Sequence, residues 1–406
     1  STAGRPASAG VCHDRALGPC SPPSGRQAGG RAGSGARYVE RPGRGLMRRA
    51  VLAIGLGATA LMLALGWLAP PVLDRAREAV FDGYQRVSPR PHAPGAPVHV
   101  IDIDRAALER YGPWPWPRSY MAELTDRLFA HGAAAVGYDL LFARPDRTSP
   151  DRIVESWSRF ADGIPPALPD LGLVPHDSRF AAAIAGRAVV LGLSGAAEGG
   201  RPAAGPGVTV TGQVPGRLTR YAAAAGNLPE LTAAAAGLGT LGPGGDAAGV
   251  TRSLPVVTGI AGRLVPSLSA ELLRVAQGAG PHVLRTAGAS GGPAAAMALR
   301  TGAHAIPLEP NGRFRIHYAG ARPDRVTPAA ALLGAEGIDP ALRDRLDGRI
   351  VLVGASAPGL SDIRTTPLGG QVAGVMLHAE IIEQIAAGAF LTRPGWMPGV
   401  ELLLVA

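Results

Sequence analysis

Charged and hydroxyl side chains follow three apolar runs of the 406-residue sequence, at the points where buried strands would end. In open α/β sheets, ligands gather beyond the carboxyl ends of the strands, because loops leave the sheet there and helix N-termini offer free N–H groups. Acids beside arginines at such an edge would suit a charged or zwitterionic small molecule, or a cation held by the carboxylates. The candidate ligand-binding residues are Asp102, Asp104, Arg118, Asp139, Ser356, Asp362 and Arg364.

The same side chains also fit a purely structural role. Asp362 with Arg364, and Arg118 with Asp139, could form internal ion pairs that only order loops. The sequence leaves both interpretations open.

Two segments match catalytic motifs in part. Asp102-Ile103-Asp104 resembles the DxD motif of haloacid-dehalogenase-type phosphatases, in which one carboxylate attacks phosphorus and its neighbour protonates the leaving group. The chain contains no lysine that could neutralise the phosphate, and Ala106 stands where such enzymes have Thr or Val. The segment 354–361 has the glycine spacing of a P-loop, but Leu360 stands at the position of the phosphate-binding lysine. No catalytic residue is therefore predicted.

Histidine and cysteine spacing gives no metal signature. The nine histidines form no HxxxH or HExxH pair, so neither a metal site nor a cofactor is predicted. Cys12 and Cys20 are the two cysteines of the sequence, so the rest of the chain has neither a disulfide nor a thiolate site. His378 lies on an apolar helix face, which is typical of a histidine hydrogen-bonded inside the core.

Hydrophobic periodicity predicts the elements that position the candidate residues. A strand over 98–104, a helix over 118–130 and a strand over 133–142 form a βαβ unit, whose crossover implies a parallel pair of strands. A helix over 180–185 and a strand over 188–193 continue this alternation.

The second half of the chain adds antiparallel elements to this pattern. A strand over 349–353 precedes a helix over 374–387, and the segments 253–269 and 306–320 look like hairpins, the second turning at Asn311-Gly312. The predicted fold class is α/β, with a mostly parallel sheet flanked by helices, antiparallel hairpin additions and one N-terminal transmembrane helix.

The connector before the first predicted helix is unusually stiff. It carries Trp114, Pro115, Trp116 and Pro117, and the prolines hold φ near −65° and prevent regular pairing. The indoles must pack or be solvated at a cost. The segment is therefore either a staple that covers the sheet edge or an aromatic platform for a ligand, and rigidity favours the staple.

An uncharged stretch near the N-terminus predicts a membrane anchor. Residues 50–69 would span roughly 30 Å as a helix, which is the hydrocarbon thickness of a bilayer. We expect a transmembrane helix over 47–69, with a cleaved signal peptide as the alternative. The preceding Arg48-Arg49 places the N-terminus in the cytoplasm of a cell with an inner membrane, and residues 70–395 in the periplasm or outside the cell.

The two ends of the chain differ from its middle. Residues 1–46 are rich in Gly, Pro and Arg without any period, which predicts a disordered tail, either a non-native extension upstream of a start at Met47 or an unstructured cytoplasmic segment. Residues 396–406 are expected to begin a second transmembrane helix of a truncated protein. Most of the net charge of +9 lies in residues 1–49, so no nucleic-acid partner is predicted.

Three segments together resemble the type-two CHASE family, which comprises extracellular sensory domains of bacterial cyclases and histidine kinases. These segments are IDIDRAALERYGPWPWPRSYMAEL from Ile101, GYDLLFARPDRTSP from Gly137, and RIVLVGASAPGLSDIRTTPLGGQVAGVMLHAEIIEQIAAGAFLTRP from Arg349. The resemblance implies that the structural signature positions include Trp114, Pro115, Trp116, Pro117, Gly354, Pro367, Gly374 and His378.

The resemblance also implies a function. We expect a membrane-anchored extracytoplasmic sensor over 70–395 that passes a small-molecule or ionic signal to an output domain outside this chain, an adenylate or guanylate cyclase or a histidine kinase. We expect the membrane and a second copy in a homodimer as partners, and no catalytic domain within the chain. An extracytoplasmic hydrolase or phosphatase that uses the strand-end acids is the alternative.

Overall fold

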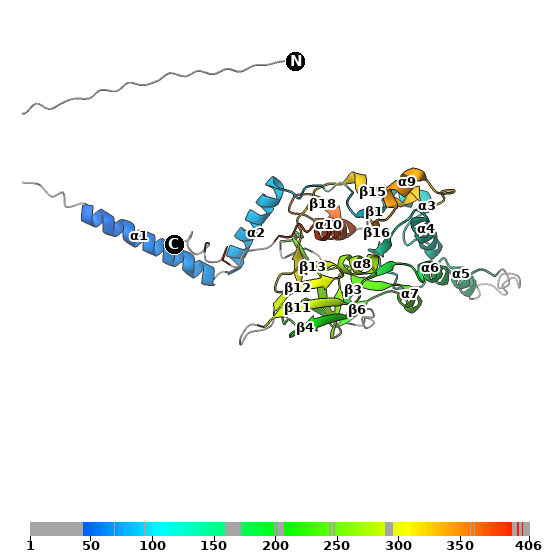
Figure 1. Cartoon of the computed structure of the whole chain (residues 1–406), viewed down its shortest axis with the longest axis horizontal. Coiled ribbons are helices and arrows are strands. Elements are labelled where there is room, and N and C mark those ends of the chain that lie inside the picture. The colour runs from blue at the N-terminus through cyan, green and yellow to red at the C-terminus, as the bar shows by residue number, and fades with distance from the viewer. Residues whose placement is uncertain are drawn as a thin grey trace, which may run out of the picture. The chain divides into compact units, whose positions relative to one another are not determined.

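The computed structural model describes residues 44–400 apart from 69, 93–94, 158, 160–171, 199, 201–206, 243–244, 247, 289–294, 358, 361, 392–395 and 398–399 (Figure 1). The predicted tail over 1–46, except for its last three residues, lies outside the described part. Of the predicted second membrane segment over 396–406, only 396, 397 and 400 are described. The chain divides into two compact units, 1–61 and 62–406.

The N-terminal apolar stretch is helical, as α1 (Arg44–Leu68). Within the described part of the chain, however, no helix is both long and apolar enough to cross a membrane. The predicted transmembrane helix over 47–69 is corrected accordingly.

The second unit is a mixed α/β structure with several sheets. Its largest sheet has the strand order β15-β1-β16-β2-β3-β6, with β7 also paired to β3. All its pairings are parallel except that of β6 with β3. The strands are β1 (Val98–Ile103), β2 (Ala135–Tyr138), β3 (Val189–Ala196), β6 (Ala223–Ala225), β7 (Gly237–Thr240), β15 (Val326–Pro328) and β16 (Ile350–Ala355).

The late strand β16 lies between the first two strands of the sheet. Val100 pairs with Leu352 on one side of β16, and Gly137 pairs with Leu352 on the other. The prediction that β1 and β2 are direct neighbours was therefore wrong, although both strands run in the same direction. A strand that returns more than 200 residues later can insert here because β1 and β2 each expose an unpaired edge after the first crossover.

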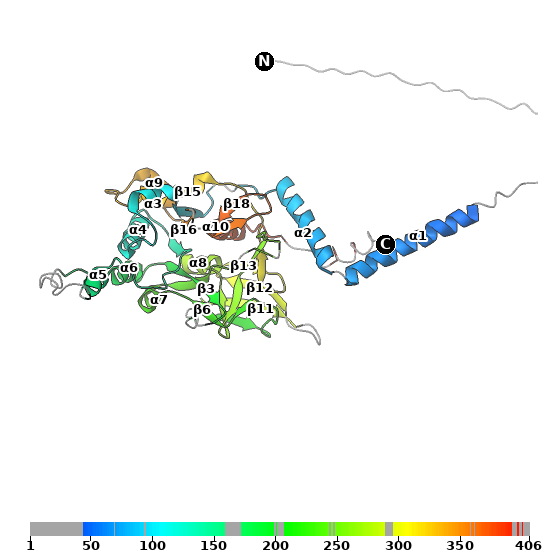
Figure 2. The ribbon, with the colours of Figure 1, turned by 180° about the vertical axis from the view of Figure 1, so that it is seen from behind.

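Helices cover both faces of this sheet (Figures 1 and 2). Alternate residues of β1 enter different cores: Ile101 packs with α4 and α6, whereas Val100 packs with α8 and α10. Gly137 in β2 lets α8 approach closely, because a Cβ there would lie 2.3 Å from Leu272. The helices of the second unit are α2 (Pro70–Val87), α3 (Arg105–Tyr111), α4 (Arg118–Ala130), α5 (Pro150–Trp157), α6 (His176–Ile184), α7 (Pro229–Ala234), α8 (Leu268–Ala276), α9 (Pro340–Leu346), α10 (Gly374–Ala386), and the 3-10 turns η2 (Pro323–Arg325) and η3 (Ala329–Ala331).

Smaller sheets complete the unit. The hairpin predicted within 253–269 is present as β9 and β10. The turn at Asn311-Gly312 also forms, but its two arms pair with different strands, β13 with β12 and β14 with β8, so the second predicted hairpin was wrong. These strands are β4 (Val208–Thr211), β5 (Arg220–Tyr221), β8 (Ser253–Pro255), β9 (Val257–Ile260), β10 (Arg263–Pro266), β11 (His282–Ala287), β12 (Ala295–Thr301), β13 (His304–Pro307), β14 (Arg313–Arg315), β17 (Ile363–Thr365) and β18 (Gln371–Ala373).

The proline-rich connector leads directly into α4. Trp116 is buried in the core beneath α4 and donates its indole N–H to the Gly112 carbonyl at 2.7 Å. Tyr111 and Tyr120 meet its ring edge-on, with centroids 5.9 and 6.1 Å away. Trp116 therefore acts as a staple and offers no open face to a ligand, whereas Trp114 is half-buried beside it.

Candidate functional site

Two of the predicted acids meet at the carboxyl edge of the main sheet. Asp139 follows β2, and its backbone N–H donates to the Val353 carbonyl of β16 at 2.8 Å. Asp362 precedes β17. Both carboxylates reach the start of α10, where a Cβ added to Gly374 would lie 3.3 Å from Asp362 Oδ2 and 3.5 Å from Asp139 Oδ2. The two carboxylates thus lie on either side of one point beside the first residue of α10.

Arg364 supplies the positive charge of this group. Its guanidinium binds the Asp362 carboxylate, and its side chain is largely buried, whereas that of Asp362 is 59% exposed. Burial, with a further contribution from the Asp362 charge, raises the pKa of Asp139 to about 7, while Arg364 opposes the rise. We call Asp139, Asp362 and Arg364 the strand-end cluster.

Asp102 and Ser356 form a second pair at the same edge. Asp102 Oδ2 accepts from the Ser356 hydroxyl at 2.6 Å, and Oδ1 accepts from the Ser356 backbone N–H at 2.9 Å. Burial raises the pKa of Asp102, although both hydrogen bonds from Ser356 oppose this rise. Since Asp102 is the penultimate residue of β1 and Ser356 follows the adjacent β16, the pair ties the ends of two strands together.

The remaining predicted residues lie elsewhere. Asp104 is the N-cap of α3 and accepts from the Ala107 backbone N–H at 2.8 Å. Arg118 is buried at the start of α4, where its Nε lies 3.7 Å from Asp177 Oδ1 and its guanidinium stacks on Phe142. Among the described residues, Arg118 therefore pairs with Asp177, and the predicted ion pair of Arg118 with Asp139 does not form. Asp102 and Asp104, the two acids of the DxD-like segment, are thus both engaged in hydrogen bonds, with Ser356 and with the start of α3.

The signature residues mostly support the surroundings of the strand-end cluster. Gly354 in β16 is opposite Val375, whose Cβ would lie 2.5 Å from a Cβ at that position. Pro367 accepts a hydrogen bond from Arg86 of α2 through its carbonyl, at 2.9 Å. His378 is buried between the Ser269 hydroxyl at 2.7 Å and the Leu241 carbonyl at 3.3 Å, and burial lowers its pKa to about 4. A neutral His378 is thus fully hydrogen-bonded within the core.

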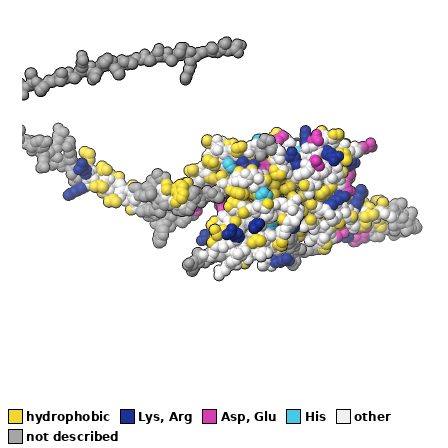
Figure 3. All heavy atoms as spheres, viewed as in Figure 1, with side chains coloured by type: hydrophobic (Ala, Val, Ile, Leu, Met, Phe, Trp, Pro, Cys, Tyr) yellow, Lys and Arg dark blue, Asp and Glu magenta, His cyan; other side chains and the backbone are white. Residues whose placement is uncertain are grey.

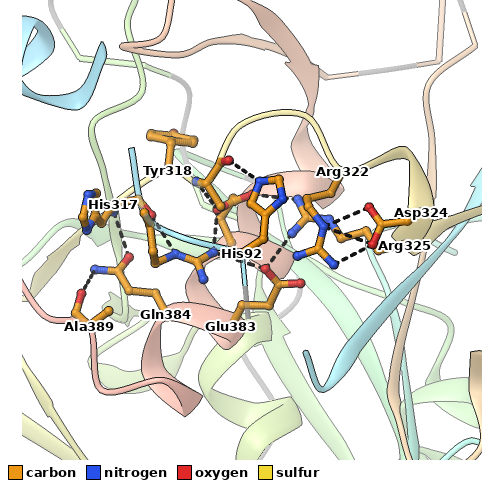
Figure 4. A network of polar contacts seen from close by, with 12 residues as sticks. His92, His317, Tyr318, Arg322, Asp324, Arg325, Glu383, Gln384 and Ala389 are labelled. Carbon is orange, nitrogen blue, oxygen red and sulfur yellow. Dashed lines mark hydrogen bonds and ion pairs between the residues drawn. The ribbon is translucent and has the colours of Figure 1, made fainter. Parts of the chain in front are cut away.

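A buried ionic network in the middle of α10 was not predicted (Figure 4). Arg90 Nη2 lies 2.8 Å from Glu380 Oε2 and 3.1 Å from Glu383 Oε2. Arg325 bridges the same two acids at 2.8 and 2.9 Å. All four side chains are at most 5% exposed. We call these residues the α10 ion network.

The α10 ion network joins distant parts of the chain. Arg90 follows α2, Arg325 ends η2, and both bind the same helix. Arg90 Nε also donates to the His317 carbonyl at 3.0 Å, and the Ala319 backbone N–H donates to Glu380 at 3.0 Å. The sequence does contain a signal for this network. Two acids stand three residues apart in the largely apolar segment GVMLHAEIIEQIAA, and acids buried with such a segment require charged partners.

The described residues offer no metal centre, since none of their His, Cys, Asp and Glu side chains form a group of three that could hold an ion.

On the face in Figure 3, basic and acidic side chains are interspersed over the described surface.

Comparisons with known proteins give one match. The family model of the CHASE2 domain matches residues 58–406, which is most of the chain. No curated protein and no solved structure shows significant similarity to it.

Proposed function

Because the chain belongs to the CHASE2 family of extracellular sensory domains, we propose that it detects an external signal at the strand-end cluster and passes a conformational change to a cyclase or kinase output domain. The observation that carries the proposal is the position of Asp139, Asp362 and Arg364 at the first turn of α10.

The chemistry of the cluster defines the class of signal. Two carboxylates that both face the start of α10, together with one guanidinium, can bind an ammonium group and a carboxylate of the same molecule, or a small cation. Asp362 is exposed, so a solute can reach the cluster from solvent. A small charged or zwitterionic molecule therefore fits these groups better than an apolar one.

The connections of the cluster define a route for the change. The Gly374 backbone N–H donates to the Asp362 carbonyl at 2.8 Å, and Ile363 pairs with Ala373, so the β17–β18 hairpin is fastened to the start of α10. The same hairpin accepts a hydrogen bond from Arg86 of α2 at Pro367. A displacement of this hairpin would thus act on α2 and α10 together, which are the two helices nearest the ends of the domain.

A thermal-shift screen of the full chain tests the sensory site. The probes are sodium, potassium, magnesium and ammonium chlorides, and zwitterionic amino acids, each at constant pH and ionic strength. We expect at least one probe to raise the Tm of the wild type and of Asp344→Asn, which changes an exposed acid of α9, but not that of Asp362→Asn or Arg364→Gln. If all four proteins respond equally, or none responds to any probe, the cluster is not the sensory site.

The homodimer is a further part of the proposal. The face of α2 turned away from the unit carries Val80 and Val87, which are seven residues apart and 74% and 87% exposed. The opposite face binds the unit through Asp82 and Gln85. Valines at a heptad spacing on an exposed helix favour a two-stranded association, so we propose that a second copy of the chain covers this face.

A further inference from the structure

The strand-end cluster places two acids and one base in a confined space. Asp139 Oδ2 and Asp362 Oδ2 each lie within 3.5 Å of one point beside Gly374, so the two oxygens are within about 7 Å of each other. Arg364 is engaged with Asp362, and its Nε is buried without a hydrogen-bond partner among the described residues. One guanidinium therefore pairs with Asp362 and acts on Asp139 only through its charge, and the group carries one net negative charge when both acids are ionised.

Few other charges can balance this group. The elements packed against Asp139 contribute Asp362 and Arg364 from the β17 segment, and the first turn of α10 contributes the positive end of its helix dipole. His378, one turn further along α10, is neutral because burial lowers its pKa to about 4. The next strand β16 contributes only the Val353 carbonyl, which accepts the Asp139 N–H. Uptake of one proton by Asp139 would bring the group to neutrality.

We propose that Asp139 and Asp362 form a proton-sensing carboxylate pair whose protonation state sets the position of the β17–β18 hairpin against α10. This inference rests on the proposed sensory function of the same site and names the proton, taken from solvent, as one of its signals. Ionised Asp139 repels Asp362. Protonated Asp139 removes this repulsion, so Asp362, whose carbonyl accepts the Gly374 N–H, keeps the hairpin against the start of α10.

The direction of the effect follows from the environment of Asp139. Burial raises its pKa from 3.8 to about 7, so the folded chain holds this proton more tightly than the unfolded chain does. The docked state is therefore favoured below about pH 7 and is lost as the pH rises through that value. Because Arg86 binds the hairpin at Pro367, undocking is transmitted to α2.

The test is an NMR titration of the full chain carrying ¹³C-labelled aspartate carboxyl groups, together with the backbone amides of 362–376. Asp139→Asn identifies the Asp139 resonance by its loss. We expect that resonance to titrate near pH 7 in the wild type and in Asp344→Asn, and the hairpin amides to shift with the same midpoint. In Asp362→Asn, the midpoint should fall by about one pH unit or more, because the neighbouring charge is gone.

The proposal is overturned if Asp139 titrates at the ordinary carboxyl value of about 4, or if the hairpin amides do not follow it. If circular dichroism shows that Asp139→Asn does not fold, the wild type is compared with Asp362→Asn alone. A resonance that titrates near pH 7 in the wild type and at a lower pH in Asp362→Asn still supports the proposal, and an unchanged midpoint overturns it. If the titration contradicts the proton switch, but a probe in the thermal-shift screen still raises the Tm of the wild type and not that of Asp362→Asn or Arg364→Gln, the sensory site stands without the switch. The two proposals are thus tested separately.

Discussion

Replacing Arg90 by methionine should destabilise the domain strongly, because Arg90 is half of the positive charge in the α10 ion network. The substitution removes the contacts with Glu380 and Glu383 at 2.8 and 3.1 Å and the hydrogen bond to the His317 carbonyl at 3.0 Å. It leaves two buried glutamates with Arg325 alone. Breaking a buried ion pair in this way costs about 3–5 kcal/mol of the free energy of unfolding.

A second substitution separates the buried charge from the lost packing. Glu383 Oε1 is buried without a hydrogen-bond partner in the described part of the chain, so Glu383 is the acid that gains least from the network. In Arg90→Met with Glu383→Gln, Glu380 and Arg325 remain as a balanced pair at 2.8 Å. We expect the double variant to recover about 1–3 kcal/mol relative to the sum of the single variants.

The assay is urea unfolding of the wild type, both single variants and the double variant, followed by circular dichroism. Arg105→Met is the matched control, because Arg105 pairs with Glu109 at 3.4 Å with both side chains more than 70% exposed. An exposed pair of this kind is worth about 0–0.5 kcal/mol. A loss below about 1 kcal/mol for Arg90→Met, or strictly additive single variants, would refute the argument that the network is a coupled buried unit.

Three further predictions follow from the same structure. Trp116→Ala should lower the free energy of unfolding by about 3–5 kcal/mol, visible as a lower Tm, whereas half-buried Trp114→Ala should cost less; equal losses would contradict the staple. His378 has its pKa lowered to about 4 in the folded state, so its contribution is complete above about pH 6.5 and lost as the pH falls toward 4. His378→Gln should therefore reduce the loss of unfolding free energy over that interval by up to about 3 kcal/mol, and an unchanged slope would show that His378 titrates normally. Val80→Ser with Val87→Ser should shift the chain from dimer to monomer in sedimentation equilibrium, while Ala79→Ser should not; a wild-type monomer at all concentrations would exclude the dimer.

Local sequence patterns located much of the fold. The helix predicted over 118–130 coincides with α4, and α10 differs from its prediction by one residue at its end. β1 ends one residue before its predicted end, because Asp104 turns out to cap α3. These elements were accessible because their signals, apolar periodicity and prolines before a helix, act within a few residues.

The candidate site was accessible in part. Asp362 could be placed in the loop after the late strand, whereas Asp139 was predicted inside a strand over 133–142 and follows β2 only because β2 ends at Tyr138. The common edge of the two acids followed from parallel strands. The partners of Arg118 could not be predicted from the sequence. Asp146 lies in a loop and Asp177 in α6, and their approach to Arg118 depends on how α6 packs against α4. The capping role of Asp104 was not predicted, because the segment Asp102-Ile103-Asp104 resembled a catalytic motif.

The sequence by itself determined the α/β alternation, the polar strand ends and the resemblance that identified the family, because each is written in contiguous residues. Only the tertiary structure decided that β16 lies between β1 and β2, that the arms of the Asn311-Gly312 turn pair with different strands, and that Arg90 meets Glu380 across 290 positions of the chain. Contacts between distant segments depend on which buried edges and charges find partners when the whole core closes.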